Sequence, residues 1–132
     1  MMEENGLPKG WVETTLGEVG KTITGKTPST KEDSFWGGEI PFITPTDINN
    51  NSRYCIPART ISEKGKESLK TSIIPQNAIC YTSIASIGLL CISKQESLTN
   101  QQINSLIVNK SNDHLFFYYY LKFLTPSLKK IA

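Results

Sequence analysis

Residues 20–27, G-K-T-I-T-G-K-T, are the stretch whose residue types and spacing most directly suggest chemistry. They match G-x-x-x-x-G-K-[S/T], the pattern of loops that cradle nucleotide phosphates with backbone N–H groups and a lysine. Such a loop needs a buried strand before it and a helix that begins at the lysine. Here Pro28 disfavours helical geometry at Thr27, and residues 12–19 are interrupted by two glutamates and a glycine. Nucleotide binding is therefore kept only as an alternative interpretation.

Other residues that could do chemistry are sparse. His114 is the one histidine, and no local cysteine or serine signature surrounds it. The cysteines are odd in number, widely spaced and without a C-x-x-C pair, so neither a disulfide framework nor a zinc site is supported. We expect buried thiols at Cys55, Cys80 and Cys91. The sequence predicts no catalytic residue and no metal site.

The size and charge of the chain narrow its class. Its 132 residues and 14.7 kDa suit one domain with one core. A net charge of +2, from 14 basic and 12 acidic residues, falls short of the strongly basic composition that marks a nucleic-acid-binding protein by itself. No apolar run approaches the roughly 20 residues of a membrane span, and the N-terminus lacks a secretory pattern. We expect a cytoplasmic protein that does not associate with membranes.

Strand patterns dominate the middle of the chain. Three β-rich runs separated by Gly or polar turns predict a mostly antiparallel sheet, at residues 78–84, 88–92 and 103–108. Further strands are expected at residues 40–46, which two prolines restrict to an edge or a short strand, and at residues 59–61.

The end of the chain has a different period, because apolar residues recur at spacings of three and four. This spacing predicts an amphipathic helix over residues 112–131, capped by Asn112 or Asp113 and kinked or restarted at Pro126. Residues 62–70 are compatible with one or two further helical turns. The predicted fold class is α+β, a small and mostly antiparallel β-rich domain with short helices and a C-terminal amphipathic helix.

Positive charge is concentrated in two segments. Residues 20–38 are rich in Gly, Ser, Thr and Lys and are predicted to form an exposed, structured loop. Residues 53–70 hold five basic residues against two acidic ones, whereas residues 1–20 hold one Lys and four Glu. A short entry strand before these segments is expected to be anchored by Trp11, Leu16 and Val19.

Several stretches, taken in order, resemble a target recognition domain of a type I restriction-modification specificity subunit. They are L-P-K-G-W (7–11), L-G-E-V (16–19), T-G-K-T-P-S (24–29), G-G-E-I-P-F-I-T-P-T-D-I (37–48), I-S-E-K-G (61–65), S-I-G (86–88) and T-N-Q-Q-I-N (99–104). The resemblance covers residues 7–131. It implies that the T-G-K-T-P segment belongs to a recognition-domain loop that binds no nucleotide.

The resemblance also implies a function. Specificity subunits perform no chemistry; they read a split double-stranded DNA sequence, one recognition domain per half-site. They recruit methyltransferase subunits that use S-adenosylmethionine and restriction subunits that use ATP and magnesium, and the methyltransferase flips the target base into its own pocket. No cofactor is therefore expected in this chain itself.

The length departs from the family's pattern. A full member carries two recognition domains separated by long helical spacers, and 132 residues match only one domain. We expect a single target recognition domain over residues 1–132, either a half-subunit or a truncated piece. The alternative is a fragment that acts mainly by associating with methyltransferase subunits, or with a second specificity half, through residues 112–131.

DNA recognition divides the candidate residues into two roles, because phosphate contacts position a protein whereas hydrogen bonds to base edges specify sequence. We expect the two basic segments to face the DNA. The candidates for phosphate or groove contacts are Lys21, Lys26, Thr27, Ser29, Lys31, Arg59, Lys64 and Lys66. The candidates for base reading, with a plain polar turn as the alternative for the asparagines, are Asn49, Asn50, Asn51, Arg53 and Tyr54.

A third group of amides has a different expected role. The T-N-Q-Q run holds Thr99, Asn100, Gln101 and Gln102. The resemblance implies that this run is shared among subunits that read different sequences. We therefore expect it to order the backbone or touch phosphate instead of specifying bases.

Overall fold

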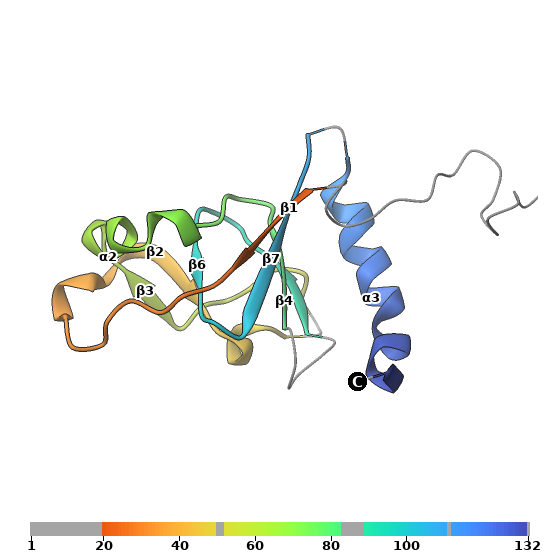
Figure 1. The fold of residues 1–132 in the computed structure, drawn as a ribbon, viewed down its shortest axis with the longest axis horizontal. Helices are drawn as coiled ribbons and strands as arrows, with labels where there is room; N and C mark the ends of the chain where they lie inside the picture. Colours follow the sequence, from red (N-terminus) through yellow and green to blue (C-terminus); the bar gives the residue numbers. More distant parts are fainter. Residues whose placement is uncertain (1–19, 50–51, 83–88, 111, 132) are drawn as a thin grey trace, which may run out of the picture.

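The computed structural model describes residues 20–49, 52–82, 89–110 and 112–131. These ranges form two β-sheets, helices α2 and α3, and three short 3-10 turns, η1 (Asp33–Phe35), η2 (Pro45–Asp47) and η3 (Lys70–Ser72). Figure 1 shows α2 with β2 and β3 at one end of the molecule, β1, β7 and β4 in the middle, and α3 at the other end. The expected entry strand with Trp11, Leu16 and Val19 lies outside the described residues.

The larger sheet is antiparallel throughout. Its strands, in spatial order, are β1 (Gly20–Thr24), β7 (Ile103–Val108), β4 (Ile79–Thr82) and β5 (Leu90–Ile92). The prediction of an antiparallel sheet from the three β-rich runs is confirmed. The prediction of a loop beginning at Gly20 is wrong for β1, because the β-branched Thr22, Ile23 and Thr24 pair along β7.

The smaller sheet has the order β3 (Arg59–Ile61), β2 (Trp36–Ile43) and β6 (Leu98–Thr99). β3 has the predicted bounds and runs antiparallel to β2, whereas β6 runs parallel to it. The sequence predicts an edge strand or a short strand at residues 40–46; both alternatives are wrong, since β2 has eight residues and lies between its two neighbours. Pro41 is tolerated there because β6 pairs only with Phe42 and Ile43, beyond the proline.

Side-chain caps fix where the two helices begin. α2 (Glu63–Ser68) follows Ser62, whose Oγ accepts the Gly65 N–H at 3.1 Å. α3 (His114–Ile131) follows Asp113, whose Oδ1 accepts the Leu115 N–H at 2.9 Å, as the capping prediction requires. α3 continues past Pro126 to Ile131. Among the described residues, no helix is long and apolar enough to cross a membrane.

Tyr118 connects α3 to the larger sheet. This side chain is buried, and it packs in one apolar cluster with Ile79, Ile92 and Leu106. Its neighbours on the same helix, Phe116, Tyr119 and Tyr120, are exposed. The aromatic run thus contains a core-packing face and an exposed flank.

Cys55 and Cys91 form a disulfide, with their Cα atoms 5.5 Å apart. The expectation of buried free thiols is wrong for this pair and confirmed for Cys80. Spacing in sequence does not reveal the pairing, which arises because a bridge between Tyr54 and Ile92 places the two segments side by side. The Cys80 sulfur lies within 4.8 Å of the other two. Burial raises the pKa of Cys80 to about 12, so this thiol stays protonated at neutral pH.

Candidate nucleic-acid interface

Residues 20–27 do not form a phosphate-binding loop. Their first five residues are strand β1, which pairs with β7, and the Gly25 N–H donates to the Ile103 carbonyl oxygen at 3.0 Å. A Cβ at Gly25 would collide with Thr99 and Asn100, so the glycine is explained by close packing of the backbone. No helix begins at Lys26. The nucleotide-binding alternative is therefore excluded by the local geometry.

The loop that follows β1 is fastened to the smaller sheet. The Trp36 indole N–H donates to the Ser29 carbonyl oxygen at 3.0 Å. Ser62, the residue that caps α2, donates its backbone N–H to the Phe35 carbonyl oxygen at 2.9 Å and its hydroxyl to the Ser34 carbonyl oxygen at 2.5 Å. These bonds join the loop over residues 25–35 to the junction of β3 and α2.

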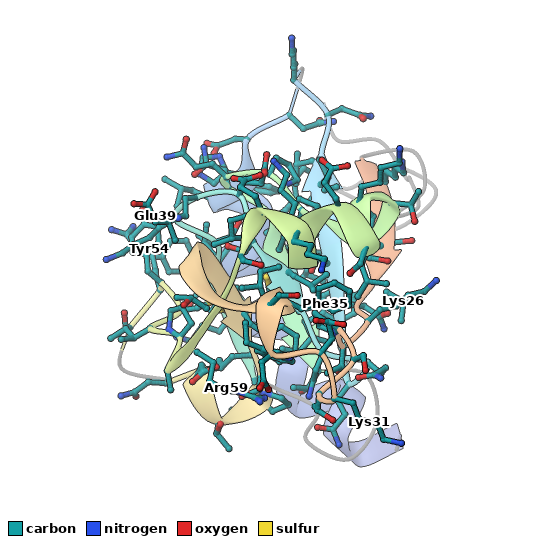
Figure 2. The ribbon with its side chains drawn as sticks, turned by 90° about the vertical axis from the view of Figure 1, so that its left-hand side faces the viewer. Lys26, Lys31, Phe35, Glu39, Tyr54 and Arg59 are labelled. Atoms are coloured by element: carbon teal, nitrogen blue, oxygen red, sulfur yellow. A yellow bond between two sulfur atoms is a disulfide. The ribbon has the colours of Figure 1, made fainter. Side chains whose placement is uncertain are left out.

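The two basic segments therefore form one surface. We define the basic surface as Lys26, Lys31, Arg59 and Lys64; all four side chains come from the joined segments, and Figure 2 labels three of them on the face that presents α2 and the β2–β3 pair. Lys26 and Lys31 are exposed, and within the described part of the chain neither side chain has a hydrogen-bond or ion-pair partner. Both ammonium groups are thus available to an anionic partner.

Arg59 has a more restricted position. It is the first residue of β3, opposite Phe42 in the β2–β3 register. Its guanidinium carbon lies 4.8 Å from the centroid of the Trp36 ring and 5.0 Å from that of Phe42, within the range of cation–π contacts. The two rings are themselves nearly perpendicular, at 84° and 5.2 Å. Arg59 is exposed to solvent, but its guanidinium contacts the rings of Trp36 and Phe42.

Lys64 and Lys66 differ in availability. Lys64 lies 5.8 Å from the centroid of the Phe35 ring and faces solvent. Its charge helps to lower the pKa of Glu32, together with the larger effect of the hydrogen bond that the Ser34 hydroxyl donates to this carboxylate. Lys66 instead forms an ion pair with Glu96, whose hydrogen bond raises the pKa of Lys66. The Lys66 side chain, which was predicted to contact DNA, is thus already engaged in an ion pair with Glu96.

Three other candidates for phosphate or groove contacts are not part of the basic surface. Lys21 lies on β1 opposite Ile107, outside the contacts that join the loop to α2. Thr27 donates its hydroxyl to Gln101 Oε1 at 2.6 Å. The Ser29 hydroxyl oxygen accepts the Lys31 N–H at 3.3 Å. Thr27 and Ser29 therefore help to shape the loop that carries Lys26 and Lys31.

The candidates for base reading lie in a second group. Arg53 donates to the hydroxyl of Tyr119 on α3 at 3.2 Å, and Arg53 and Lys94 both lie over the Tyr54 ring, at 5.7 and 5.5 Å. In Figure 2, Tyr54 and Lys26 lie on opposite sides of the view. Asn49 is exposed beside this group. Asn50 and Asn51 lie outside the described residues. The contacts described for Arg53 and Tyr54 are with Tyr119 and Lys94, which are not part of the basic surface.

Asp47 is an organising residue that the sequence reasoning missed. Its carboxylate accepts the Thr44 N–H at 2.9 Å, the Thr44 hydroxyl at 3.1 Å and the Ala58 N–H at 3.2 Å. Its carbonyl oxygen accepts the Ile56 N–H at 3.4 Å. Both ends of the segment that carries Asn49, Arg53 and Tyr54 are therefore tied to one side chain and its backbone. The signal in the sequence is the T-x-x-D spacing of a capping box.

The T-N-Q-Q run begins with the last residue of β6 and leads into β7. Thr99 is buried, Asn100 donates its N–H to the Ile43 carbonyl oxygen at 3.0 Å, and its side-chain oxygen accepts the Gln102 N–H at 3.1 Å. Gln101 accepts the Thr27 hydroxyl. These bonds link the smaller sheet, β7 and the basic loop, which supports a backbone-ordering role for the run.

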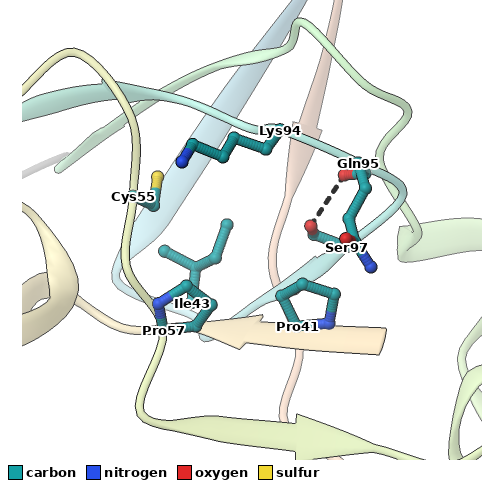
Figure 3. A pocket seen from close by; sticks show the side chains of 7 residues that line it. All are labelled: Pro41, Ile43, Cys55, Pro57, Lys94, Gln95 and Ser97. Atoms are coloured by element: carbon teal, nitrogen blue, oxygen red, sulfur yellow. Dashed lines mark hydrogen bonds between the residues drawn. The ribbon is translucent and has the colours of Figure 1, made fainter. Parts of the chain in front are cut away.

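A pocket of about 100 Å³ lies beside β2 and the segment around Cys55 (Figure 3). Its lining residues are Pro41, Ile43, Cys55, Pro57, Lys94, Gln95 and Ser97. The volume suits a few water molecules and is well below the roughly 300 Å³ at which ligand pockets begin. This pocket is therefore too small for a ligand of ordinary size.

The fold and this surface define a class of small α+β domain in which two basic segments, distant in sequence, are joined on one face. Residues 8–132 match the family described as type I restriction modification DNA specificity domain. The chain belongs to this family. The resemblance that the sequence motifs indicate is thus confirmed.

Individual relatives agree with this assignment. The type I restriction enzyme HindI specificity subunit of Haemophilus influenzae is 36% identical over 124 residues, which cover 94% of this chain and 27% of that protein. The MjaIX specificity subunit of Methanocaldococcus jannaschii is 34% identical over 130 residues, which cover 96% of this chain and 30% of that protein. The chain thus spans less than a third of the length of these relatives.

A solved structure supports the fold. The crystal structure of the HsdS subunit from Thermoanaerobacter tengcongensis is similar with a TM-score of 0.73 and 22% sequence identity, covering 92% of this chain and 29% of that one. The predicted α+β class, mostly antiparallel with a C-terminal helix, is confirmed.

Proposed function

We propose that this chain is a non-catalytic DNA-reading domain that recognises one half-site of a split double-stranded target. Membership of the specificity family supports this proposal. The observation that carries it is the hydrogen bonding of Trp36 to Ser29 and of Ser62 to Ser34, which joins two basic segments into one surface. Such a surface offers positive charge to the phosphates of a DNA backbone.

The roles proposed for the side chains follow from how each is held in the structure. Lys26 and Lys31 are exposed ammonium groups with no partner among the described residues, which suits contacts to phosphate that carry no sequence information. Asn49, Arg53 and Tyr54 lie on a segment held at both ends by Asp47, which suits a base-reading segment that must keep its shape. In the assembled enzyme, the domain directs methyltransferase and restriction subunits to the half-site, and S-adenosylmethionine, ATP and magnesium belong to those partner subunits.

Binding of labelled random-sequence duplexes, followed by fluorescence anisotropy over a series of salt concentrations, tests the proposal. We expect about three to six phosphate contacts, and hence a log–log salt slope of about −3 to −5. The double variant Lys26→Gln, Lys31→Gln should reduce this slope by about 2 and weaken binding to all sequences alike. Lys110→Gln, which removes one positive charge outside the basic surface, is the single-site control for either lysine. A slope near zero in the wild type would overturn the proposal.

A second candidate function is supported by the exposed aromatic flank of α3. Phe116 and Tyr120 stack with their centroids 6.1 Å apart, and Phe116 is 46% exposed and Tyr120 44%. Exposed apolar surface of this kind is typical of contacts between proteins. The candidate is association with a methyltransferase subunit or a second specificity half, with DNA binding secondary. Co-purification of Phe116→Ala, Tyr120→Ala with such a subunit, compared with mobility shift on DNA, separates the two functions.

A further inference from the structure

We propose that Arg59 reads a guanine base in the major groove of the target. This inference rests on the proposed function. It assigns to Arg59 a sequence-specifying role in place of the general phosphate or groove contact that the sequence suggests. The basic surface then contains one base-reading side chain, Arg59, among lysines that contact phosphate.

The Arg59 side chain has a restricted position. The guanidinium of Arg59 lies about equally far from the Trp36 and Phe42 rings, at 4.8 and 5.0 Å, and these rings are at 84° to each other. Phe42 is fully buried, and the Trp36 indole is held by its hydrogen bond to Ser29. A long side chain usually loses considerable rotamer freedom when it binds, and this one has lost much of that freedom beforehand.

The N–H groups of the Arg59 guanidinium are available for recognition. Among the described residues, nothing accepts a hydrogen bond from the Arg59 guanidinium and no carboxylate pairs with it. Two other cations of the second segment are engaged: Arg53 bonds to Tyr119, and Lys66 pairs with Glu96. The Trp36 and Phe42 rings accept no conventional hydrogen bond, so the N–H groups of Arg59 have no oxygen acceptor among the described residues and are available to a planar partner.

The guanidinium group and the major-groove edge of guanine are chemically complementary. A guanidinium presents two parallel N–H donors, and guanine presents O6 and N7 as two acceptors on its major-groove edge. A phosphate can accept the same two donors, but a lysine on a flexible stem is sufficient to neutralise it. The exposed Lys26 and Lys31 on the same basic surface supply that function.

Selection of duplexes from a randomised library by the 132-residue chain, followed by sequencing, tests the assignment. We expect a selected motif with at least one strongly preferred guanine. Arg59→Lys keeps the charge but loses the two-pronged donor, so the preference at that one position should fall on the order of 10- to 100-fold while other positions keep theirs. Lys31→Gln, the control, should lower recovery of all sequences without changing the motif.

A change in the DNA gives a second test that leaves the fold intact. In the selected duplex, 7-deazaguanine at the critical position removes N7 alone. The wild type should lose roughly tenfold in affinity, and Arg59→Lys should lose little more, because the two changes remove the same interaction.

Three outcomes would overturn the assignment. An unchanged motif in Arg59→Lys would show a phosphate contact, and loss of a preference for A·T pairs would show minor-groove insertion. Equal effects of 7-deazaguanine on the wild type and on Arg59→Lys would separate Arg59 from that base. If the wild type retains no duplex at any salt concentration, the proposed function itself fails, which is a distinct result from a motif that does not depend on Arg59.

Discussion

Trp36 donates its indole N–H to the carbonyl oxygen of Ser29, seven residues earlier, across 3.0 Å. Because the same ring supports the Arg59 guanidinium, one side chain positions cations from both basic segments. The geometry of the surface therefore depends on a residue that bears no charge.

Trp36→Phe should loosen the loop while preserving an aromatic ring beside Arg59. Without the indole donor, we expect trypsin to cleave after Lys26 and Lys31 several-fold faster than in the wild type, since local opening controls such cleavage. Mass spectrometry of timed digests measures this rate. Cleavage after Lys110, in the turn beyond β7, is the internal control. Equal acceleration at all three lysines would indicate general destabilisation and contradict the prediction.

Asp47→Asn should destabilise the fold, because an amide cannot replace a carboxylate that accepts hydrogen bonds from both Thr44 and Ala58. Hydrogen bonds to a charged group contribute about 1.5–3 kcal/mol each, and we expect a loss of roughly 2–3 kcal/mol in the free energy of unfolding, measured with urea. Asp33→Asn, at an exposed position in η1, should change it by no more than about 0.5 kcal/mol. Equal effects of the two changes would rule out the special role of Asp47.

The cysteines should give a stepwise labelling pattern with an alkylating reagent. In the native chain at pH 8, no cysteine should react, because two are bonded and the pKa of Cys80, raised to about 12 by burial, leaves roughly one thiolate in ten thousand. Denaturation should expose one reactive thiol, and added reductant should expose three. Intact-mass measurement counts the labels, and Cys80→Ala should remove the label that appears on denaturation. Three labels without reductant would contradict the disulfide.

Gly25→Ala should be destabilising, because the added Cβ would overlap the Thr99 side chain and the Asn100 carbonyl oxygen. Forced overpacking costs about 1–3 kcal/mol, which thermal unfolding detects. Gly37→Ala is an instructive comparison, since that site has open space but a φ of +74°, so its cost should be the roughly 1–2 kcal/mol of a left-handed residue. If nucleotide binding were the role of Gly25, its replacement would leave the stability of the free protein unchanged.

Elements with a clear local pattern could be predicted from the sequence. β7 and β3 have the expected bounds because β-branched residues and polar turns delimit them, and α3 follows from the spacing of its apolar residues. β6 was missed because its two residues, Leu98 and Thr99, are too few to show an alternation. β1 was missed because Gly and Lys resemble loop composition, and its pairing with β7 depends on residues more than eighty positions away.

The candidate surface was only partly predictable for the same reason. Lys26, Lys31 and Arg59 are recognisable as local concentrations of charge. Their proximity depends on hydrogen bonds to the carbonyl oxygens of Ser29 and Ser34, and backbone acceptors have no residue-type signature. The disulfide of Cys55 is a similar case, because only the folded chain brings it beside its partner.

The pairing of β1 with β7 has a consequence for how this domain can be built into longer polypeptides. Gly20, where β1 begins, lies opposite Val108, where β7 ends just before α3 (Figure 1). The chain therefore enters and leaves the sheets through adjacent, hydrogen-bonded strands. Everything between those two points can be exchanged for a different version while the flanking segments keep their separation. In polypeptides as long as the two relatives described above, which exceed this chain more than threefold in length, such an arrangement permits one module of this fold to replace another without rebuilding the rest of the protein.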